Sequence, residues 1–324
     1  MSNPQAMVEE RLSHNKWGIL GSQGYILGLD IGSYGLRAAL IDLQKHTYAS
    51  MHREVSSDQA EVLVSGMIDL ARELLAEHHV DLNRLVRVGV GFGGPVDVRR
   101  GVVLLSPRLA GWEQFPLRER IEAAFGADTL VDNDANLIAL AEATFGVGRD
   151  VQNLFYLHLS SGVGGGLVIN GRLYHGATAT AGEIGHALIA PIDRLHGEQS
   201  PVTLEQRVSI RGLLQRADAL GLQTDSLKDI FSDNSIGQQV IAETTDVLAA
   251  RLSQITALID PEMIVLGGIV VRIGGDSFIS SITSHMHDYM VWEVERSTPL
   301  VSSMLGFDSV AIGGVALALE SMNE

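Results

Sequence analysis

Short apolar runs that end in a glycine or a polar residue recur along the first half of the chain. Tyr25–Asp30 has a strand pattern that ends in an acid, and Leu36–Leu43 and Val86–Phe92 are further strand patterns. Between them, the apolar residues of 58–77 are spaced by three and four positions, which predicts one face of a helix with Asp58 as its N-cap. The first half therefore predicts an α/β lobe.

The second half of the chain repeats this order of elements. A strand pattern at Leu154–Leu159 runs into the glycine-rich segment 160–166, and Asn170-Gly171 is typical of a two-residue type I′ hairpin turn. A long helix is predicted over Ile236–Ile259, followed by a strand at Met263–Leu266. Two copies of strand, glycine turn and strand predict two similar lobes that face a cleft, where a small molecule would bind.

These patterns predict how the chain is divided. Residues 1–24 are polar and weakly patterned, which is typical of a tail or of the remnant of an upstream segment. The N-terminal lobe is expected to span 25–135 and to include a C-terminal helix at 310–322, which follows a last strand near 301–307. The C-terminal lobe then spans 136–309.

Composition narrows the class of protein. A length of 324 residues suits two domains of about 150 residues each. The net charge of −16 argues against binding to nucleic acid, and the absence of cysteine excludes disulfides and thiolate-held metals. The chain has neither an apolar run of the ~20 residues that a membrane helix needs nor a signal-peptide pattern at its start. A cytoplasmic location without a membrane partner is the expectation.

Glycine-rich turns follow strand patterns at three places, 30–35, 160–166 and 267–268. Consecutive glycines let backbone N–H groups converge on an anion such as a phosphate. The alternative for any one of them is a strained hairpin without a ligand. The three together favour a nucleotide-shaped site or the descendant of one.

The polar segment 132–136 opens a predicted helix. Asn133 and Asp134 are good helix caps, and a carboxylate at a strand end can also take a proton from a substrate hydroxyl. Both interpretations can hold at one helix start, and four acid or amide side chains exceed what one cap requires.

Two further polar positions have a structural and a functional interpretation. His186 is either a hydrogen-bonded structural histidine or a contact to a sugar or metal. Glu205 is either a capping partner or a ligand-binding acid. Taken alone, each position favours the structural interpretation.

The motifs occur in the order typical of the ROK family of sugar kinases and sugar-responsive repressors, which the chain resembles over about residues 25–320. The matching segments are Gly28–Gly32, Gly93–Asp97, Asn133–Asn136, Ser161–Gly166, Glu183–His186, Val265–Gly268 and Gly313-Gly314. The resemblance implies the sugar-kinase and actin-like architecture of two RNase H-like α/β lobes. ROK kinases transfer the γ-phosphate of ATP to a hexose or N-acetylhexosamine, and relatives with an N-terminal helix-turn-helix are repressors that sense sugars.

The resemblance also implies roles for individual residues. Asp134 would be the general base that deprotonates a sugar hydroxyl. The other implied sugar-pocket positions are Gly94, Asn133, Glu183, His186 and Glu205. The implied nucleotide positions are Asp30 and Gly32 in the first phosphate loop, Ser161, Gly162, Gly164 and Gly165 in the second, and Gly267-Gly268 beside adenosine. ATP and Mg²⁺ would be retained only in a kinase, and a homodimer or homotetramer is expected by analogy.

Three departures from the family pattern bear on function. The first phosphate loop of ROK kinases usually ends in glycine, threonine and lysine, where this chain has Ser33, Tyr34 and Gly35. The cysteine cluster that binds zinc beside the sugar is absent. Arg108 stands where kinases tend to place a sugar-binding asparagine, so it could fill the pocket or pair with an acidic ligand.

Two functions remain open from the sequence. The favoured one is the effector-binding part of a ROK regulator that keeps a sugar pocket and has lost most phosphoryl transfer; DNA contact would then require a helix-turn-helix region, which this chain does not contain. The alternative is an ATP-dependent hexose or N-acetylhexosamine kinase, favoured by the retained Asp134 and Gly162–Gly166.

The missing cysteines predict that the protein carries no stoichiometric zinc, because His186 and His196 have no partners at tetrahedral ligand spacing. Elemental analysis of protein purified without chelators measures this. One zinc per chain that is lost on His186→Ala or His196→Ala would contradict the prediction.

Overall fold

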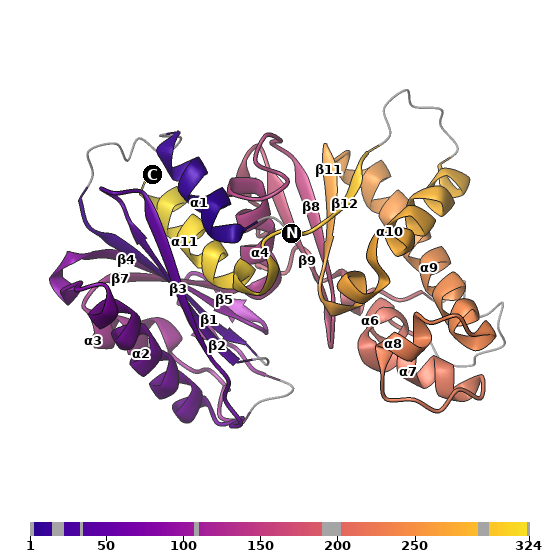
Figure 1. The fold of residues 1–324 in the computed structure, drawn as a ribbon, viewed down its shortest axis with the longest axis horizontal. Coiled ribbons are helices and arrows are strands. Elements are labelled where there is room, and N and C mark those ends of the chain that lie inside the picture. Colours follow the sequence, from indigo (N-terminus) through magenta and orange to yellow (C-terminus); the bar gives the residue numbers. More distant parts are fainter. Residues whose placement is uncertain are drawn as a thin grey trace. The chain divides into compact units, whose positions relative to one another are not determined.

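The computed structural model describes residues 3–14, 23–32, 35–106, 110–189, 202–290 and 298–322. The chain divides into two compact units, each a sheet with helices packed on it (Figure 1). Unit 1 comprises Met1–Asp150, Arg172–Thr180 and Met304–Glu324, and unit 2 comprises Val151–Gly171 and Ala181–Ser303. The predicted α/β class is confirmed.

Unit 1 is built on a five-stranded sheet of order β3-β2-β1-β4-β7. Its strands are β1 (Tyr25–Gly32), β2 (Gly35–Asp42), β3 (Thr47–Arg53), β4 (Leu85–Phe92) and β7 (Asp128–Asn133). Strand β2 runs antiparallel to both neighbours, whereas β1, β4 and β7 are parallel. The remaining elements are helices α1 (Pro4–Ser13), α2 (Ala60–Glu77), α3 (Leu117–Phe125), α4 (Asp134–Thr144) and α11 (Ser309–Ser321), 3₁₀ turns at Leu82–Arg84 and Gly306–Asp308, and the short pair β5 (Val96–Asp97) and β6 (Val102–Val103).

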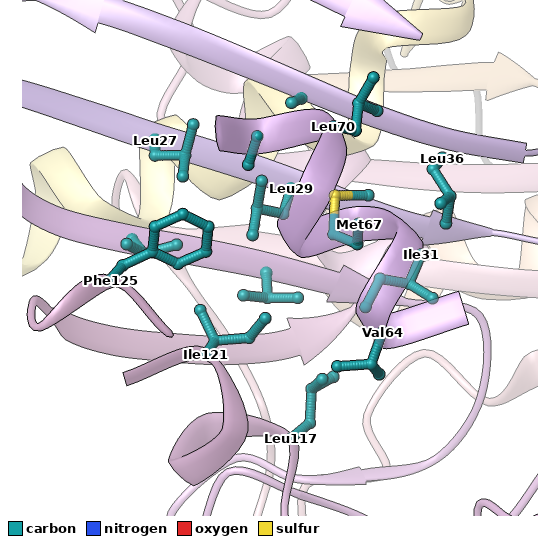
Figure 2. Packing of buried hydrophobic residues seen from close by; sticks show 14 of the residues in the cluster. Leu27, Leu29, Ile31, Leu36, Val64, Met67, Leu70, Leu117, Ile121 and Phe125 are labelled. Carbon is teal, nitrogen blue, oxygen red and sulfur yellow. The ribbon is translucent and has the colours of Figure 1, made fainter. Parts of the chain in front are cut away.

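Helices α2 and α3 cover one face of this sheet (Figure 2). Side chains alternate between faces along a strand, so Leu27, Leu29 and Ile31 of β1 all point into this layer. The spacing of Val64, Met67 and Leu70 puts them on one side of α2 against those strand residues. All of these side chains are buried, and they form the core that holds β1 against α2.

Helix α11 lies unusually close to the opposite face, because glycines line the contact. A Cβ on Gly28 of β1 would collide with the carbonyl oxygen of Ala311, and a Cβ on Gly89 of β4 would collide with that of Gly314. Gly28 and Gly89 are paired in the sheet, so together they form one flat patch under the helix. A larger residue at position 28 or 89 would therefore displace the backbone of α11.

The second sheet has five strands in the order β10-β9-β8-β11-β12, which are β8 (Leu154–Leu159), β9 (Val163–Ile169), β10 (Arg172–Leu173), β11 (Met263–Gly267) and β12 (Leu300–Ser302). All of these strands except β10 belong to unit 2. Again one antiparallel partner is followed by parallel strands, so the predicted repeat of elements is present. Its helices are α6 (Leu204–Val208), α7 (Ile210–Ala219), α8 (Leu227–Ile230), α9 (Ser235–Ile259) and α10 (Ile269–Tyr289), with a 3₁₀ turn at Ile184–His186. The chain returns to unit 1 at β10 (Arg172–Leu173), after Asn170 and Gly171, whose positive φ angles confirm the predicted turn.

Four details differ from the sequence-based expectations. Gln59 rather than Asp58 is the N-cap of α2, and the strand expected near 301–307 is limited to β12. The boundary between units falls after Asp150 rather than after residue 135, because α4 packs against α11 in unit 1. Residues 4–13 form α1, whose otherwise polar sequence buries only Val8 and Leu12.

Among the residues described, no helix combines the length and the apolarity that a membrane crossing needs.

The glycine contact predicts a large cost for Gly89→Ala, since a methyl group there must displace the backbone of α11. Overpacking of this kind costs about 1–3 kcal/mol or more in the free energy of unfolding. Urea unfolding followed by circular dichroism measures the loss. Gly66→Ala in α2 is the matched control, because its Cβ would meet only a flexible methyl group of Leu36, at 3.1 Å; equal destabilisation by both changes would contradict the close-approach argument.

Candidate functional site

The candidate residues of unit 1 gather at the carboxyl ends of its parallel strands. In the sheet register, Asp30 of β1 lies beside Gly91 of β4, which lies beside Asp132 of β7. Asp30 and Asp132 are both buried, at 8 % and 1 % exposure. The next residues of the chain are Ile31 and Asn133, and Asp134 then begins α4. Strand ends of this kind are where ligands bind in open α/β sheets.

Asp30 is in an environment that favours its neutral form. Burial raises the pKa of this carboxyl to about 8, and the nearby charge of Asp134 acts in the same direction. Arg37, its cross-strand partner, lowers the pKa, and Asp308 raises it again. An uncharged carboxyl therefore predominates at neutral pH, and a cation arriving at Asp30 and Asp134 would favour release of the proton.

Asn133 and Asp134 both cap α4. The N–H of Ala135 donates to Asn133 Oδ1 at 2.9 Å and to Asp134 Oδ1 at 2.8 Å. The side-chain amide of Asn133 also donates to the carbonyl oxygen of Gly94 at 3.0 Å, so the structure brings these two predicted positions together. Capping is thus observed, and the other carboxylate oxygen of Asp134, Oδ2, lies 3.2 Å from the place of a Cβ on Gly93.

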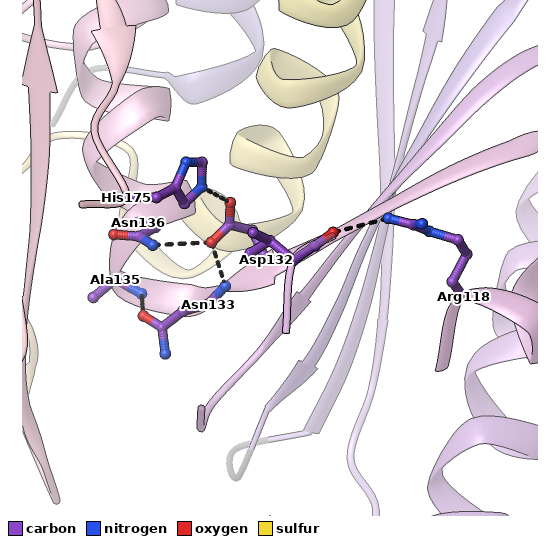
Figure 3. A network of polar contacts seen from close by, with 7 residues as sticks. Arg118, Asp132, Asn133, Ala135, Asn136 and His175 are labelled. Atoms are coloured by element: carbon purple, nitrogen blue, oxygen red, sulfur yellow. Dashed lines mark hydrogen bonds and ion pairs between the residues drawn. The ribbon is translucent and has the colours of Figure 1, made fainter. Parts of the chain in front are cut away.

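Asp132 is surrounded by donors, one of which the sequence analysis missed as a site residue (Figure 3). Its Oδ1 accepts from the N–H of Asn133 at 2.7 Å and from the side-chain amide of Asn136 at 2.9 Å, and its Oδ2 lies 2.6 Å from Nε2 of His175. The hydrogen bond to Asp132 raises the pKa of His175 against the opposing effect of burial. His175 is 43 residues away along the chain, so no local pattern could reveal this pair.

In unit 2, the segment predicted as a phosphate cradle is a hairpin. Gly164 and Gly165 lie within β9, and the turn is confined to the residues between β8 and β9. The N–H of Gly165 donates to the carbonyl oxygen of Gly182 at 2.8 Å. The N–H of Val163 donates to Glu205 Oε2 at 2.9 Å, which ties this predicted sugar-pocket acid to the turn that holds Ser161 and Gly162. These two amides are engaged within the protein.

The remaining predicted positions of unit 2 lie around the same hairpin. His186 Nε2 is 3.5 Å from Glu183 Oε2, and both side chains are largely exposed. A Cβ on Gly185 would collide with the carbonyl oxygen of Val163, so the turn that carries His186 lies against β9. Gly268, at φ +94°, lies over the carbonyl oxygen of Leu159 at the end of β8. Unit 2 therefore gathers its predicted positions on one edge.

A partly buried histidine at that edge, His158, was not predicted as a site residue. Tyr156 and His158 share a hydrogen bond of 2.8 Å between the phenol oxygen and Nδ1. Burial, with a further contribution from Arg272, lowers the pKa of His158 to about 4. A Cβ on Gly267 would collide with the Tyr156 hydroxyl, so the pair of Tyr156 and His158 packs against the glycines that were predicted to lie beside adenosine.

Some predictions fall outside the described residues, namely Ser33, Tyr34, Arg108 and the segment 190–201 that includes His196. Within the described ranges, no group of three or more His, Asp or Glu side chains could hold a metal ion. The carboxylates of Asp30 and Asp134 are nevertheless oxygen donors of the type that Mg²⁺ prefers, and Mg²⁺ commonly uses only one or two of them together with substrate phosphates.

Comparisons with known proteins identify the family of the chain. The family model described as "ROK family" matches residues 26–321. A glucokinase of Halalkalibacterium halodurans is 26% identical over 323 residues, covering 93% of this chain and 97% of the relative, and a xylose repressor of Bacillus spizizenii is 25% identical over 92% of this chain and 77% of the relative. The crystal structure of a ROK hexokinase from Thermus thermophilus is similar with a TM-score of 0.80 at 25% identity, over 93% of this chain and 100% of that one.

The raised pKa of Asp30 predicts a pH-dependent effect of Asp30→Asn. Between the ordinary value of 3.8 and about 8, the folded protein retains a proton that the unfolded chain releases, so this group weakens the fold as pH rises. Relative to the parent, Asp30→Asn should therefore gain stability between pH 5 and 8.5, with a limiting slope of ~1.4 kcal/mol per pH unit.

Urea unfolding at several pH values measures this difference. Asp69→Asn, at an exposed position of α2, is the matched control and should follow the parent at every pH. Parallel pH curves for Asp30→Asn and the parent would show that the carboxyl has an ordinary pKa.

Proposed function

The chain belongs to the ROK family, and from that premise we propose that it is a sugar-binding member whose site senses its ligand rather than phosphorylating it. By the family resemblance, the sugar contacts would be Gly94, Asn133, Asp134, Glu183, His186 and Glu205. Arg108 would add a contact to an acidic or phosphorylated sugar.

The conformation of Gly35 carries this proposal. Gly35 stands where the family resemblance expects a phosphate-binding lysine, and its φ of +107° lies in the region that side chains rarely adopt. A Cβ there would also stand 2.7 Å from the carbonyl oxygen of Arg53 in β3, which is backbone and cannot move alone. Both the missing lysine side chain and the backbone conformation at Gly35 therefore argue against a cation at this position.

The missing cation bears directly on catalysis. Phosphoryl transfer depends on positioning and on charge stabilisation of the transferring group. Removing one such electrostatic contact costs several kcal/mol, on the order of 10²–10³-fold in turnover for a single donor. The amides of Val163 and Gly165 are in addition bonded within the protein, so the second loop offers fewer donors than a glycine-rich segment implies.

A sugar kinase is the second candidate, favoured by the position of Asp134. This carboxylate begins α4 beside the buried Asp30, where it could accept a proton from a sugar hydroxyl. ATP would supply the phosphoryl group, and Asp30 in the implied first phosphate loop would hold the Mg²⁺ that accompanies it. The glucokinase relative supports this alternative, and the xylose repressor supports the first.

Two properties of a regulator follow from the family resemblance and from charge. With a net charge of −16, contact with DNA would come from a separate helix-turn-helix region. We expect a homodimer or homotetramer, as is common in the family.

Sugar binding should depend on the acids among these positions. Glu183→Ala and Asp134→Asn should each weaken binding about 5- to 150-fold, the equivalent of ~1–3 kcal/mol for sugar hydroxyls left without a partner. Calorimetric titration with glucose, xylose, N-acetylhexosamines and their phosphates measures this, and Glu113→Ala at an exposed turn is the control. Unchanged affinity in both variants would refute the site.

A coupled assay of ADP release with ATP, Mg²⁺ and the same sugars separates the two functions. A sensor should show negligible sugar-dependent turnover even with the sugar that binds best. Turnover of ~1–100 per second, typical of kinases, that is abolished by Asp134→Asn would establish the kinase instead. Gly35→Lys is unsuitable as a rescue, because its side chain has no room beside Arg53.

A further inference from the structure

The pair formed by Asp132 and His175 has no part in the function proposed above, although it lies directly beside Asn133 and Asp134. The Asp132 side chain is 2 % exposed, and that of His175 is 30 % exposed. A carboxylate buried to this degree needs donors for its lone pairs, and His175 supplies the shortest of the three that Asp132 receives.

The orientation of Asn136 shows that Asp132 organises its surroundings. Asn136 is 5 % exposed, and its amide nitrogen donates to Asp132 Oδ1. Its own Oδ1 is buried and has no hydrogen-bond partner among the described residues. A buried acceptor left unpaired is costly, so Asn136 is held in this orientation for its donation to the carboxylate.

The bonds around Asp132 span the junction between β7 and α4. One acceptor, Asp132 Oδ1, holds the backbone N–H of Asn133 at the end of the strand and the side chain of Asn136 in the first turn of the helix. Asp134 lies between these two points and has no freedom to shift without stretching one of them. The position of Asp134 is thus fixed through the carboxylate of Asp132.

His175 reaches this junction from a separate segment. Arg172–Thr180 belongs to unit 1, and the chain continues from it into Ala181–His186 of unit 2, which carries Glu183 and His186. The hydrogen bond between His175 and Asp132 therefore anchors segment 172–180. The chain runs from this segment directly to Glu183 and His186, two of the proposed sugar contacts.

The charges around His175 determine how this fastening responds to pH. Hydrogen bonding with Asp132 raises its pKa above the ordinary 6.5, the negative charges of Asp132 and of Glu320 in α11 act in the same direction, and burial opposes them. The ionic part of the contact is complete below pH 6.5 and is lost as pH rises through the higher value in the folded protein. Neutral imidazole can still donate one hydrogen bond.

We propose that His175 is a positioning residue for the Asn133–Asp134 junction, and that its charge determines how firmly the junction is held and hence how tightly the sugar binds. The second half of this inference rests on the proposed sugar site, whereas the first half can be tested without any ligand.

The ligand-free test follows backbone and side-chain amides by NMR through a pH titration of the full chain. In the parent, the His175 ring should titrate above 6.5, and the Asn133 N–H and Asn136 side-chain amide signals should follow the same curve. His175→Gln keeps a donor without a titrating charge, so both amide signals should lose the step that follows the His175 ring, whereas any step due to Asp30, whose pKa is about 8, should remain. His175→Ala should in addition speed hydrogen exchange at Asn133 by about tenfold, since the carboxylate that holds this N–H loses one of its three donors.

His52→Gln is the matched control, since His52 is exposed on β3, and it should leave the parent curves unchanged. Asp132→Asn should return the His175 pKa toward 6.5. If the His175 ring titrates while the two amide signals in the parent do not follow it, the positioning role is overturned. That result needs only the parent protein, so a variant that fails to fold cannot obscure it.

The second test repeats the sugar titration across the same pH range. The parent should bind more weakly as pH rises through the His175 titration, and His175→Gln should lose this step in affinity. A parent affinity that is flat across that range overturns the link between His175 and sugar binding. If no sugar of the panel binds to any form of the protein, the proposed function fails, while the amide titration still decides whether His175 positions the junction.

Discussion

The parallel register of β1, β4 and β7 is the constraint on which the arrangement of unit 1 depends. It places Asp30 and Asp132 at the same level of the sheet, with Gly91 between them. The sheet can hold this register under α11 only because glycines such as Gly28 and Gly89 leave no side chain between strand and helix. The position of Asp30 beside Gly91 therefore depends on the close packing of Gly28 and Gly89, which lie two residues earlier on the same two strands.

That register gives two buried carboxyls at one edge, and their surroundings differ. Asp30 lies in a desolvated position near the like charge of Asp134, so its neutral form is favoured. Asp132 accepts three hydrogen bonds, which compensate for its burial and make it a fixed point of the β7–α4 junction. Asp30 is thus suited to lose its proton when a positive charge arrives, whereas Asp132 is suited to keep Asn133, Asn136 and His175 in place.

The sequence predicted most of the elements and the strand-end positions of the candidate residues, because hydrophobic periodicity and glycine turns are local signals. It did not predict that Gly164 and Gly165 would lie within β9, since a glycine run can extend a strand as readily as it can form a loop. It also did not predict the surroundings of His158 and His175, because each depends on tertiary structure: burial and the charge of Arg272 in one case and a bond to Asp132 in the other. Periodicity contains no information about such partners.

In the proposed sensing function, the difference from a kinase would lie at Gly35, where β2 begins beside the end of β1, and not in the proposed sugar-contact motifs. Gly32 of β1 and Gly35 of β2 are paired, and Gly35 is pressed against Arg53 of the next strand. A lysine at position 35 would require β3 to shift, because its Cβ would lie too close to the carbonyl oxygen of Arg53. A single substitution of Gly35 would therefore not restore a phosphate-binding loop. Because Asn133, Glu183 and Glu205 lie on other segments, a sugar pocket built on them could remain unchanged if phosphoryl transfer were lost.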